Sequence, residues 1–140
     1  MFAKFSLHLM LIGIGLFSLV ACQAEIGQEV SADDGSYRVV SVQELQAMLE
    51  DKDFTMINVH TPWEGDIPQT DLRVPYDEID QNLVQLPQEK DAKIIVYCLT
   101  SGMAKKAVTT LLAQGYTNLW MLDGGTTAWG EAGLSLQGKP

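Results

Sequence analysis

Positive charge is scarce in this chain of 140 residues, which has 9 lysines and arginines against 18 aspartates and glutamates. The formal net charge is −9 at pH 7. Such an acidic balance argues against nucleic acid as a partner and against electrostatic docking on anionic lipid. The sequence also lacks internal repeats and low-complexity tracts, and its length fits one domain with one modest core.

A single apolar run at the N-terminus indicates export. Lys4 precedes a largely apolar stretch from Leu7 to Val20, which has the length of a signal peptide and the wrong flanks for a membrane span. The stretch ends in Leu19-Val20-Ala21-Cys22, which resembles the bacterial lipobox. In that motif the cysteine is lipidated and becomes the new N-terminus. The alternative is an uncleaved signal anchor with an incidental cysteine.

The lipobox resemblance divides the chain into three expected segments. We expect a signal peptide over residues 1–21, a flexible acidic tether over 22–36 and a folded domain over 37–137. Gln23 follows the lipidated position, where an aspartate would have favoured the inner membrane. The expected location is therefore the cell envelope, on the periplasmic side of the outer membrane in a Gram-negative host. The lipid anchor is the only membrane contact expected.

Cysteine is rare, since Cys22 and Cys98 are the only two in the chain. If Cys22 is lipidated, Cys98 is the only thiol of the mature protein, and an intramolecular structural disulfide is excluded. A leftover cysteine in an exported protein suggests a reactive thiol or an intermolecular partner. The alternative is a small buried apolar side chain, because free cysteine is often buried.

The position of Cys98 favours the reactive thiol. The residue ends an apolar run, Lys93–Tyr97, and opens a six-residue loop, Cys98–Met103. Apolar residues then recur with helical spacing from Ala104 to Leu112. A strand that ends in a thiol and turns into a helix aims backbone N–H groups and the positive end of the helix dipole at the sulfur. That field favours the thiolate, which is the nucleophilic form.

Strand and helix patterns alternate along the rest of the chain, which predicts an α/β sheet with parallel pairs. Ser41 and Glu44 form a capping-box signature at the start of the first helix. Because parallel strands end along one edge, the loops after Val59, Tyr97 and Leu122 should meet there. The expected strands are 37–40, 54–59, 72–74, 93–97 and 118–122, and the expected helices begin after residues 41, 76, 103 and 125, the second ending before Pro87 and the third at Gly115.

Three motifs in order resemble the rhodanese-like domain family over roughly residues 37–137. The strand Ile95–Cys98 with its loop and Lys105-Lys106-Ala107 resembles the active-site region of that family. Leu122-Asp123-Gly124-Gly125 with Trp129 resembles its closing motif, and Val39-Val40-Ser41 its opening. The resemblance implies a three-layer fold with a mostly parallel central sheet flanked by helices.

The resemblance also implies sulfur transfer. Cys98 would accept sulfane sulfur from a small donor and pass it to a thiol or another nucleophile. His60 and Trp63, which follow the strand at 54–59, are candidate pocket residues, with a structural role for His60 and packing for Trp63 as alternatives. No cofactor is expected, and one cysteine with one histidine does not make a metal site. The expected substrate-binding loop is Leu99, Thr100, Ser101, Gly102 and Met103.

Two departures from the family pattern bear on activity. Many members carry an arginine in the loop, whereas residues 99–104 here contain no cation. Lys105 and Lys106, one turn into the helix, are expected to face solvent, with contact to the substrate as the alternative. A thiosulfate dianion would then rely on backbone dipoles alone, so a neutral or singly charged persulfide is favoured as donor. In addition, Asn58-Val59-His60 stands where the family usually has Asp-Val-Arg, so the usual ion pair cannot form.

Two other functional classes share parts of this sequence pattern. A phosphatase or arsenate reductase of the related cysteine-loop type needs an arginine to hold a tetrahedral oxyanion, so the loop composition excludes it. A rhodanese-like binding module with little turnover remains the alternative, because the loop lacks a cation. The hydroxyls of Thr100 and Ser101 have two alternative roles, as donors to substrate and as local turn or helix-cap groups.

Overall fold

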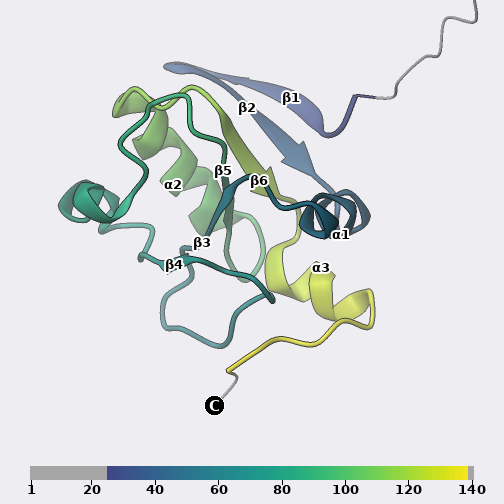
Figure 1. The fold of residues 1–140 in the computed structure, drawn as a ribbon. Helices are drawn as coiled ribbons and strands as arrows, with labels where there is room; N and C mark the ends of the chain where they lie inside the picture. Colours follow the sequence, from purple (N-terminus) through teal and green to yellow (C-terminus); the bar gives the residue numbers. More distant parts are fainter. Residues whose placement is uncertain (1–24, 139–140) are drawn as a thin grey trace, which may run out of the picture.

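The computed structural model describes residues 25–138, which fold around one six-stranded sheet (Figure 1). The strand order is β1-β2-β6-β5-β3-β4, with β1 antiparallel to β2 and every other neighbouring pair parallel. The elements are β1 (Gln28–Ala32), β2 (Gly35–Val40), α1 (Val42–Glu50), β3 (Thr55–Asn58), β4 (Leu72–Arg73), the 3₁₀ helices η1 (Ile79–Gln81) and η2 (Leu83–Gln85), β5 (Ile94–Tyr97), α2 (Gly102–Ala113), β6 (Leu119–Leu122) and α3 (Gly125–Glu131).

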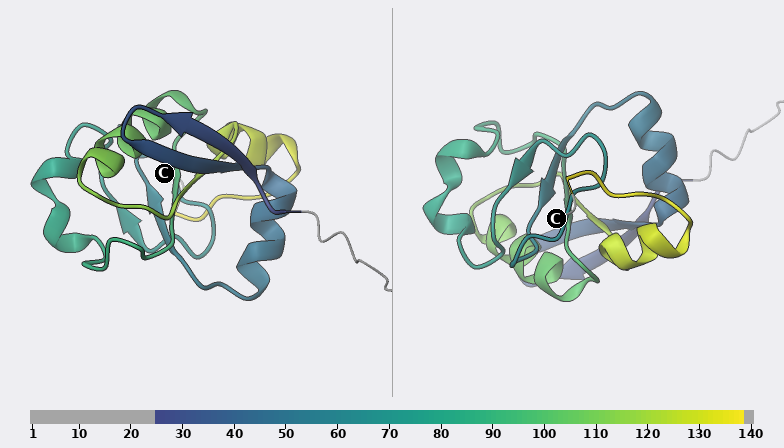
Figure 2. Two further views of the ribbon diagram at one scale, coloured as in Figure 1. Left: turned by 90° about the horizontal axis from the view of Figure 1, so that it is seen from above. Right: turned by 90° about the horizontal axis from the view of Figure 1, so that it is seen from below.

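Helices cover both faces of the sheet, so the predicted three-layer α/β architecture is confirmed (Figure 2). Successive strand residues point to opposite faces, which explains how one strand serves two cores. Ile94 and Val96 of β5 pack with the apolar face of α2, while Ile95 and Tyr97 pack with α1 and α3. All four residues of β5 are buried, as expected of a central parallel strand.

The capping box predicted at the start of α1 is confirmed. The Ser41 hydroxyl accepts a hydrogen bond from the Glu44 amide at 3.2 Å, and the Glu44 carboxylate accepts one from the Ser41 amide at 2.8 Å. The same carboxylate accepts a second N–H, from Gly27, at 2.9 Å. These bonds, from Ser41 first and then Gly27, hold the pKa of Glu44 below its ordinary value. Glu44 thereby joins the first helix to the segment that precedes β1.

The segment expected to be a flexible tether is a β-hairpin over most of its described length. Residues 28–32 pair with residues 35–39 in antiparallel register, and Gly35 takes a φ of +146° beside Leu112. The prediction of a tether was wrong there, because Asp33-Asp34 makes the tight turn of a hairpin and Gly35 begins its second strand. Residues 22–24 of that segment, like the signal peptide and the expected lipidation site Cys22, lie outside the described residues.

Two helix predictions also needed correction. The helix expected from residue 77 is replaced by η1 and η2, because Leu86 must be extended before Pro87 and only Ile79 is buried in these two turns. The six-residue loop after β5 is shorter than expected, since α2 already begins at Gly102 with Ser101 as its N-cap. None of the helices between residues 25 and 138 has the length and hydropathy of a membrane span.

Candidate functional site

Cys98 lies at the C-terminal end of β5, beneath the first turn of α2. The residue is only 1% exposed, and it belongs to the apolar cluster that joins the sheet to α2. Its Sγ accepts a hydrogen bond from the Ala104 amide at 3.4 Å. The sulfur therefore lies against one of the N–H groups that an α-helix leaves without a partner at its N-terminus. Such an N–H favours negative charge on the sulfur.

The loop after Cys98 is held by α3 through its carbonyl groups. The amides of Thr126 and Thr127, in the first turn of α3, donate to the carbonyls of Cys98 and Leu99 at 2.9 Å each. The first turn of α3 thus binds the loop, while the first turn of α2 faces the sulfur. Leu99 is 40% exposed and Thr100 is exposed, so both form the outer rim over the buried sulfur.

Ser101, expected in the substrate-binding loop, bonds to the neighbouring loop instead. Its hydroxyl donates to the Asp123 carboxylate at 3.2 Å and accepts the Gly124 amide at 3.0 Å. It makes no side-chain capping bond to α2. Gly102 is exposed and Met103 is half-buried against the cluster that contains Cys98. The hydroxyls of Ser101 and Thr100 therefore differ. That of Ser101 is hydrogen-bonded within the protein, whereas Thr100 lies at the exposed rim.

The glycine pair after β6 permits a very close approach of the two loops. Gly124 and Gly125 have φ values of +70° and +53°, a left-handed region that favours glycine. A Cβ on Gly125 would lie 2.5 Å from the Thr100 carbonyl oxygen and closer still to that of Cys98. No side chain fits at this position. Glycine is therefore required at position 125, because α3 begins directly against the cysteine loop.

A buried polar network lies on the other face of the sheet edge, around Asp66. Its carboxylate accepts hydrogen bonds from the amide of Asn58 at 2.9 Å, the indole of Trp63 at 3.1 Å and the guanidinium of Arg73 at 2.6 Å. The Arg73 guanidinium also stacks on the Trp63 ring, 4.0 Å from its centroid. Burial would raise the pKa of Asp66, but the hydrogen bonds from Arg73, Asn58 and Trp63 and the charge of Arg73 hold it below 3.8.

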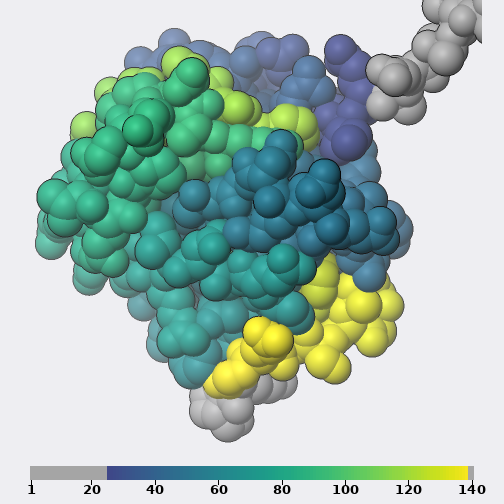
Figure 3. All heavy atoms as spheres, in the orientation of Figure 1, coloured from purple at the N-terminus to yellow at the C-terminus, as the bar shows by residue number. Residues whose placement is uncertain are grey.

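This network supplies an ion pair in place of the one that the sequence lacks. Asn58 stands where the resembled family usually has an aspartate, and its amide joins the Asp66–Arg73 pair instead of forming a pair itself. Sequence reasoning missed Asp66 and Arg73, since neither belongs to a periodic pattern. Trp63, expected as a possible pocket wall, is engaged here through both its N–H and its ring face. The C-terminal segment, yellow in Figure 3, lies against the teal part of the chain, and Gln137 is bridged to Asp66.

His60 is tied to its own loop and forms no hydrogen bond with Cys98. Its amide donates to the Asn58 side-chain oxygen at 3.0 Å, and its Nε2 lies 2.7 Å from the Glu64 carboxylate. The Nδ1 atom is buried without a hydrogen-bond partner among the described residues. The ring is thus oriented by Glu64. Between residues 25 and 138, no three His, Cys, Asp or Glu side chains are grouped so that they could hold a metal ion.

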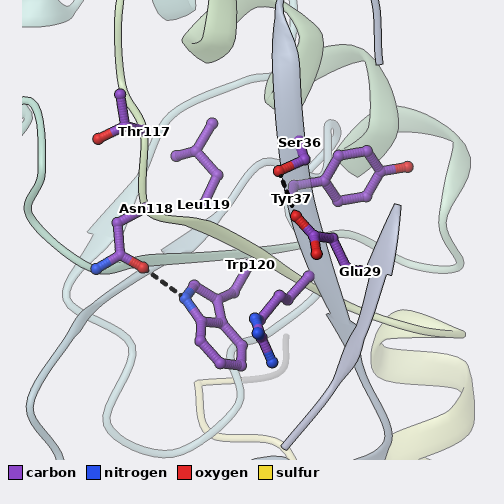
Figure 4. A pocket seen from close by; sticks show the side chains of 8 residues that line it. Glu29, Ser36, Tyr37, Thr117, Asn118, Leu119 and Trp120 are labelled. Atoms are coloured by element: carbon purple, nitrogen blue, oxygen red, sulfur yellow. Dashed lines mark hydrogen bonds between the residues drawn. The ribbon is translucent and has the colours of Figure 1, made fainter. Parts of the chain in front are cut away.

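A polar hollow of about 140 Å³ lies at the opposite edge of the sheet, near the start of β6 (Figure 4). Its lining includes Glu29, Ser36, Asn118 and Trp120. The polar groups already pair with one another, Ser36 with Glu29 and Trp120 with Asn118, at 2.8 Å in each case. Because β5 and β6 are parallel, their C-terminal ends share the other edge, so this hollow is remote from Cys98.

Tyr97 packs on the face opposite Cys98 and makes the strand end pH-sensitive. Its hydroxyl accepts the Ile67 amide at 3.0 Å and lies 2.7 Å from the Thr70 hydroxyl. Burial raises the pKa of Tyr97 from 10.0 to about 12. The neutral phenol is therefore favoured in the folded state, and its stabilising contribution is complete below pH 10.0 and lost as the pH rises toward about 12.

We expect the urea midpoint of the wild-type protein to fall more steeply above about pH 10 than that of Tyr97→Phe. Urea unfolding followed by tryptophan fluorescence at about pH 8 and about pH 11 measures the difference. Equal slopes for the two proteins would contradict the assignment. At the lower pH the variant itself should be destabilised by about 1–3 kcal/mol, because the buried Ile67 amide loses its acceptor.

The comparisons with known proteins agree with this architecture. Residues 41–132 match the family described as the Rhodanese-like domain, which is well over half of the chain. This chain belongs to the rhodanese-like domain family. Among solved structures it is similar to a rhodanese-like domain protein from Staphylococcus aureus, with a TM-score of 0.59 and 29% identity over 71% of this chain and 97% of that one.

Two relatives of this rhodanese-like domain carry names that refer to sulfur transfer. A sulfurtransferase of Allochromatium vinosum is 29% identical over 94 residues, covering 65% of this chain and 85% of the relative. A thiosulfate sulfurtransferase GlpE of Vibrio cholerae is 26% identical over 100 residues, covering 70% and 92%. The chain spans a much smaller share, 28%, of a tRNA uridine(34) hydroxylase of Enterobacter sp., with 31% identity over 101 residues.

Proposed function

We propose that Cys98 is the sulfur-carrying residue of a sulfurtransferase or persulfide carrier. The Cys98 thiolate attacks the sulfane sulfur of an anionic donor, the donor's sulfur–sulfur bond breaks, and a cysteine persulfide forms. With thiosulfate as donor, the bonding electron pair leaves with sulfite. An acceptor thiolate then attacks the outer sulfur of the persulfide, which releases the Cys98 thiolate and a new persulfide on the acceptor.

The observation that carries this proposal is the bond between Cys98 Sγ and the Ala104 amide. A buried cysteine that served only as packing would need no donor of this kind. The amide at the helix N-terminus stabilises negative charge on sulfur both in the attacking thiolate and in the persulfide product. The named activities of the relatives from Allochromatium vinosum and Vibrio cholerae support the same chemistry.

The burial of Cys98 limits what can react with it. Because the residue is 1% exposed, a donor reaches the sulfur only when the residues that cover it move aside. A slim sulfur chain suits such an entrance better than a bulky group. The lipid anchor expected at Cys22 would hold the domain at the cell envelope, where its donor and acceptor would be met.

Intact mass spectrometry of the purified chain tests the proposal. After brief incubation with thiosulfate, and separately with polysulfide, we expect a mass increase of one sulfur atom that a thiol acceptor removes. Cys98→Ser should abolish the increase, whereas Cys22→Ser should retain it, because only the former removes the sulfur next to Ala104. Absence of the adduct from both donors on a folded chain with a reduced Cys98 would overturn sulfur transfer.

A binding module with little turnover is the second candidate. Two observations favour it: the near-complete burial of Cys98, and a loop whose Ser101 hydroxyl is already bonded to Asp123 and Gly124. The same mass measurement separates the two functions, since a binding module acquires no sulfur.

A further inference from the structure

Uncompensated positive charge is concentrated beside the cysteine loop. Four cationic side chains among residues 25–138 form ion pairs with carboxylates, namely Arg38, Lys52, Arg73 and Lys93. The three described lysines without an ion pair are Lys90, Lys105 and Lys106, and two of these lie in the first two turns of α2. A chain with a net charge of −9 thus keeps two free cations next to its one described thiol.

Lys106 is distinguished from Lys105 by its contact with Tyr76. Its ammonium lies 5.2 Å from the centre of the Tyr76 ring, within the range of a cation–π interaction. The contact joins α2 to the segment after β4, thirty residues earlier in the chain. Lys105 has no aromatic contact of this kind among the described residues. The ammonium of Lys106 is therefore held against the Tyr76 ring, whereas Lys105 projects into solvent as expected from the sequence.

Tyr76 lies on the Cys98 side of the sheet edge. Its amide donates to the Val59 carbonyl at 3.1 Å, and the Val59 amide in turn donates to the carbonyl of Tyr97, the residue before Cys98. Tyr76 also packs against the apolar cluster that contains Cys98 and Ala104. Lys106 follows Ala104 by two residues, which is a rise of about 3 Å and a turn of about 200° around the helix, so its side chain leaves the exposed face of α2 toward Tyr76. The Tyr76–Lys106 pair thus flanks the end of α2 whose amide contacts the sulfur.

We propose that the Tyr76–Lys106 pair attracts the anionic end of the sulfane-sulfur donor and determines the preference for charged donors. This inference rests on the proposed function of Cys98. Lys106 supplies the charge, and Tyr76 is a positioning residue that holds the ammonium beside the cysteine loop. Residues 99–104 contain no cation. The positive charge that acts on the donor is therefore supplied from α2, by Lys106. The thiosulfate dianion then becomes a competent donor, contrary to the expectation from the loop alone.

The test compares charged and neutral reagents at Cys98 in the full chain. One arm measures the rate constant for sulfur loading from thiosulfate by intact mass spectrometry. The other measures the ratio of alkylation rates with iodoacetate and iodoacetamide, with the modification located at Cys98 by peptide mass spectrometry. For Lys106→Gln we expect both the rate constant and the ratio to fall about three- to tenfold, the size expected for one charge acting at close range in water. Alkylation by iodoacetamide should be unchanged.

Lys90→Gln is the matched control. Lys90 also stacks on a tyrosine, Tyr116, at 3.9 Å, but it precedes β5 and so lies at the opposite edge of the sheet. Its substitution removes the same charge and the same kind of contact, and we expect both readouts to stay at the wild-type value. Tyr76→Leu should lower the iodoacetate ratio and Tyr76→Phe should restore it, because the phenyl ring retains the cation–π contact.

Three outcomes would overturn the assignment of Lys106. These are unchanged readouts in Lys106→Gln, an equal fall in Lys90→Gln, and an equal fall in Lys105→Gln, which would show that net charge or mere proximity suffices. Failure of the proposed function has a different signature. A wild-type chain that acquires no sulfur from thiosulfate or polysulfide overturns sulfur transfer, while the alkylation ratio still decides whether Lys106 attracts anions to Cys98.

Discussion

Replacement of Gly125 by alanine is expected to destabilise the folded state by about 3 kcal/mol or more. The added Cβ would lie 2.5 Å from the Thr100 carbonyl oxygen and 2.8 Å from the Leu99 carbonyl carbon. These are backbone atoms, so no side-chain rotation relieves the overlap. The φ of +53° adds about 1 kcal/mol of strain for a residue with a Cβ. Relief requires α3 to move away from the cysteine loop.

Movement of α3 would break the two hydrogen bonds that hold the carbonyls of Cys98 and Leu99. We therefore expect the Gly125→Ala chain that remains folded to load sulfur at Cys98 more slowly than the wild type. Urea unfolding followed by circular dichroism measures the first effect, and intact mass spectrometry below the unfolding transition measures the second.

Gly130→Ala is the control for this substitution. Gly130 belongs to the same helix, and a Cβ at that position meets nothing within 4 Å. The same chemical change should therefore leave stability unchanged or raise it by up to about 1 kcal/mol, since alanine has the higher helix propensity. Equal unfolding midpoints for the two variants would contradict the close approach of α3 to the cysteine loop.

Removal of the Asp66 carboxylate in Asp66→Ala is expected to lower the free energy of unfolding by about 2–4 kcal/mol, mainly through the donors of Asn58 and Trp63, because the Arg73 side chain is 56% exposed and remains hydrated. Three donors lose their acceptor at once, from Asn58, Trp63 and Arg73, and the Asp66 side chain is only 10% exposed. Unpaired polar groups in such a site lose their solvation without a replacement bond. Urea unfolding at neutral pH measures the loss.

Asp53→Ala is the surface counterpart of this change. It deletes a carboxylate that pairs with Lys93 at 3.0 Å but is 70% exposed, and the expected change lies within about 1 kcal/mol. The stability loss of Asp66→Asn should lie between those of Asp66→Ala and Asp53→Ala, because the asparagine oxygen still accepts a hydrogen bond while the charge opposite Arg73 is lost. Similar losses for Asp66→Ala and Asp53→Ala would show that the network contributes no more than a surface pair.

The depressed pKa of Asp66 also gives the wild-type protein a pH dependence of known sign. Above the ordinary value of 3.8 the carboxylate is ionised in both the folded and unfolded states, and its full contribution is present. As the pH falls below 3.8, the unfolded chain takes up the proton first, so the stabilising contribution is lost. Asp66→Asn should therefore lose less stability than the wild type over that acid range.

Local periodicity explains why most elements were predictable from the sequence. The apolar run before Cys98 and the helical spacing after it depend on neighbours within one or two turns. The capping box at Ser41 and Glu44 spans three residues and is visible for the same reason. Strand β1 was missed because its stability depends on pairing with β2, and β2 in turn is held by β6, some eighty residues later in the chain.

The candidate site was only partly predictable. Cys98 stands out by its position after a buried strand, and the family match agrees with the motifs around it. The partner of Ser101 was not predictable, because Asp123 and Gly124 reach it from another crossover of the sheet. The network of Asp66 and the contact between Lys106 and Tyr76 were invisible for the same reason.

The sequence by itself therefore determined the order of the strands and helices from residue 37 onward apart from the segment before Pro87, together with the family and the position of the thiol, because these follow from residue types at short spacings. The tertiary structure alone decided that the Ala104 amide faces the sulfur, that α3 binds the loop carbonyls and that Lys106 lies over Tyr76. Each of these contacts depends on how separate crossovers place their ends at one edge of the sheet. That placement is a property of the packed layers and not of any short segment.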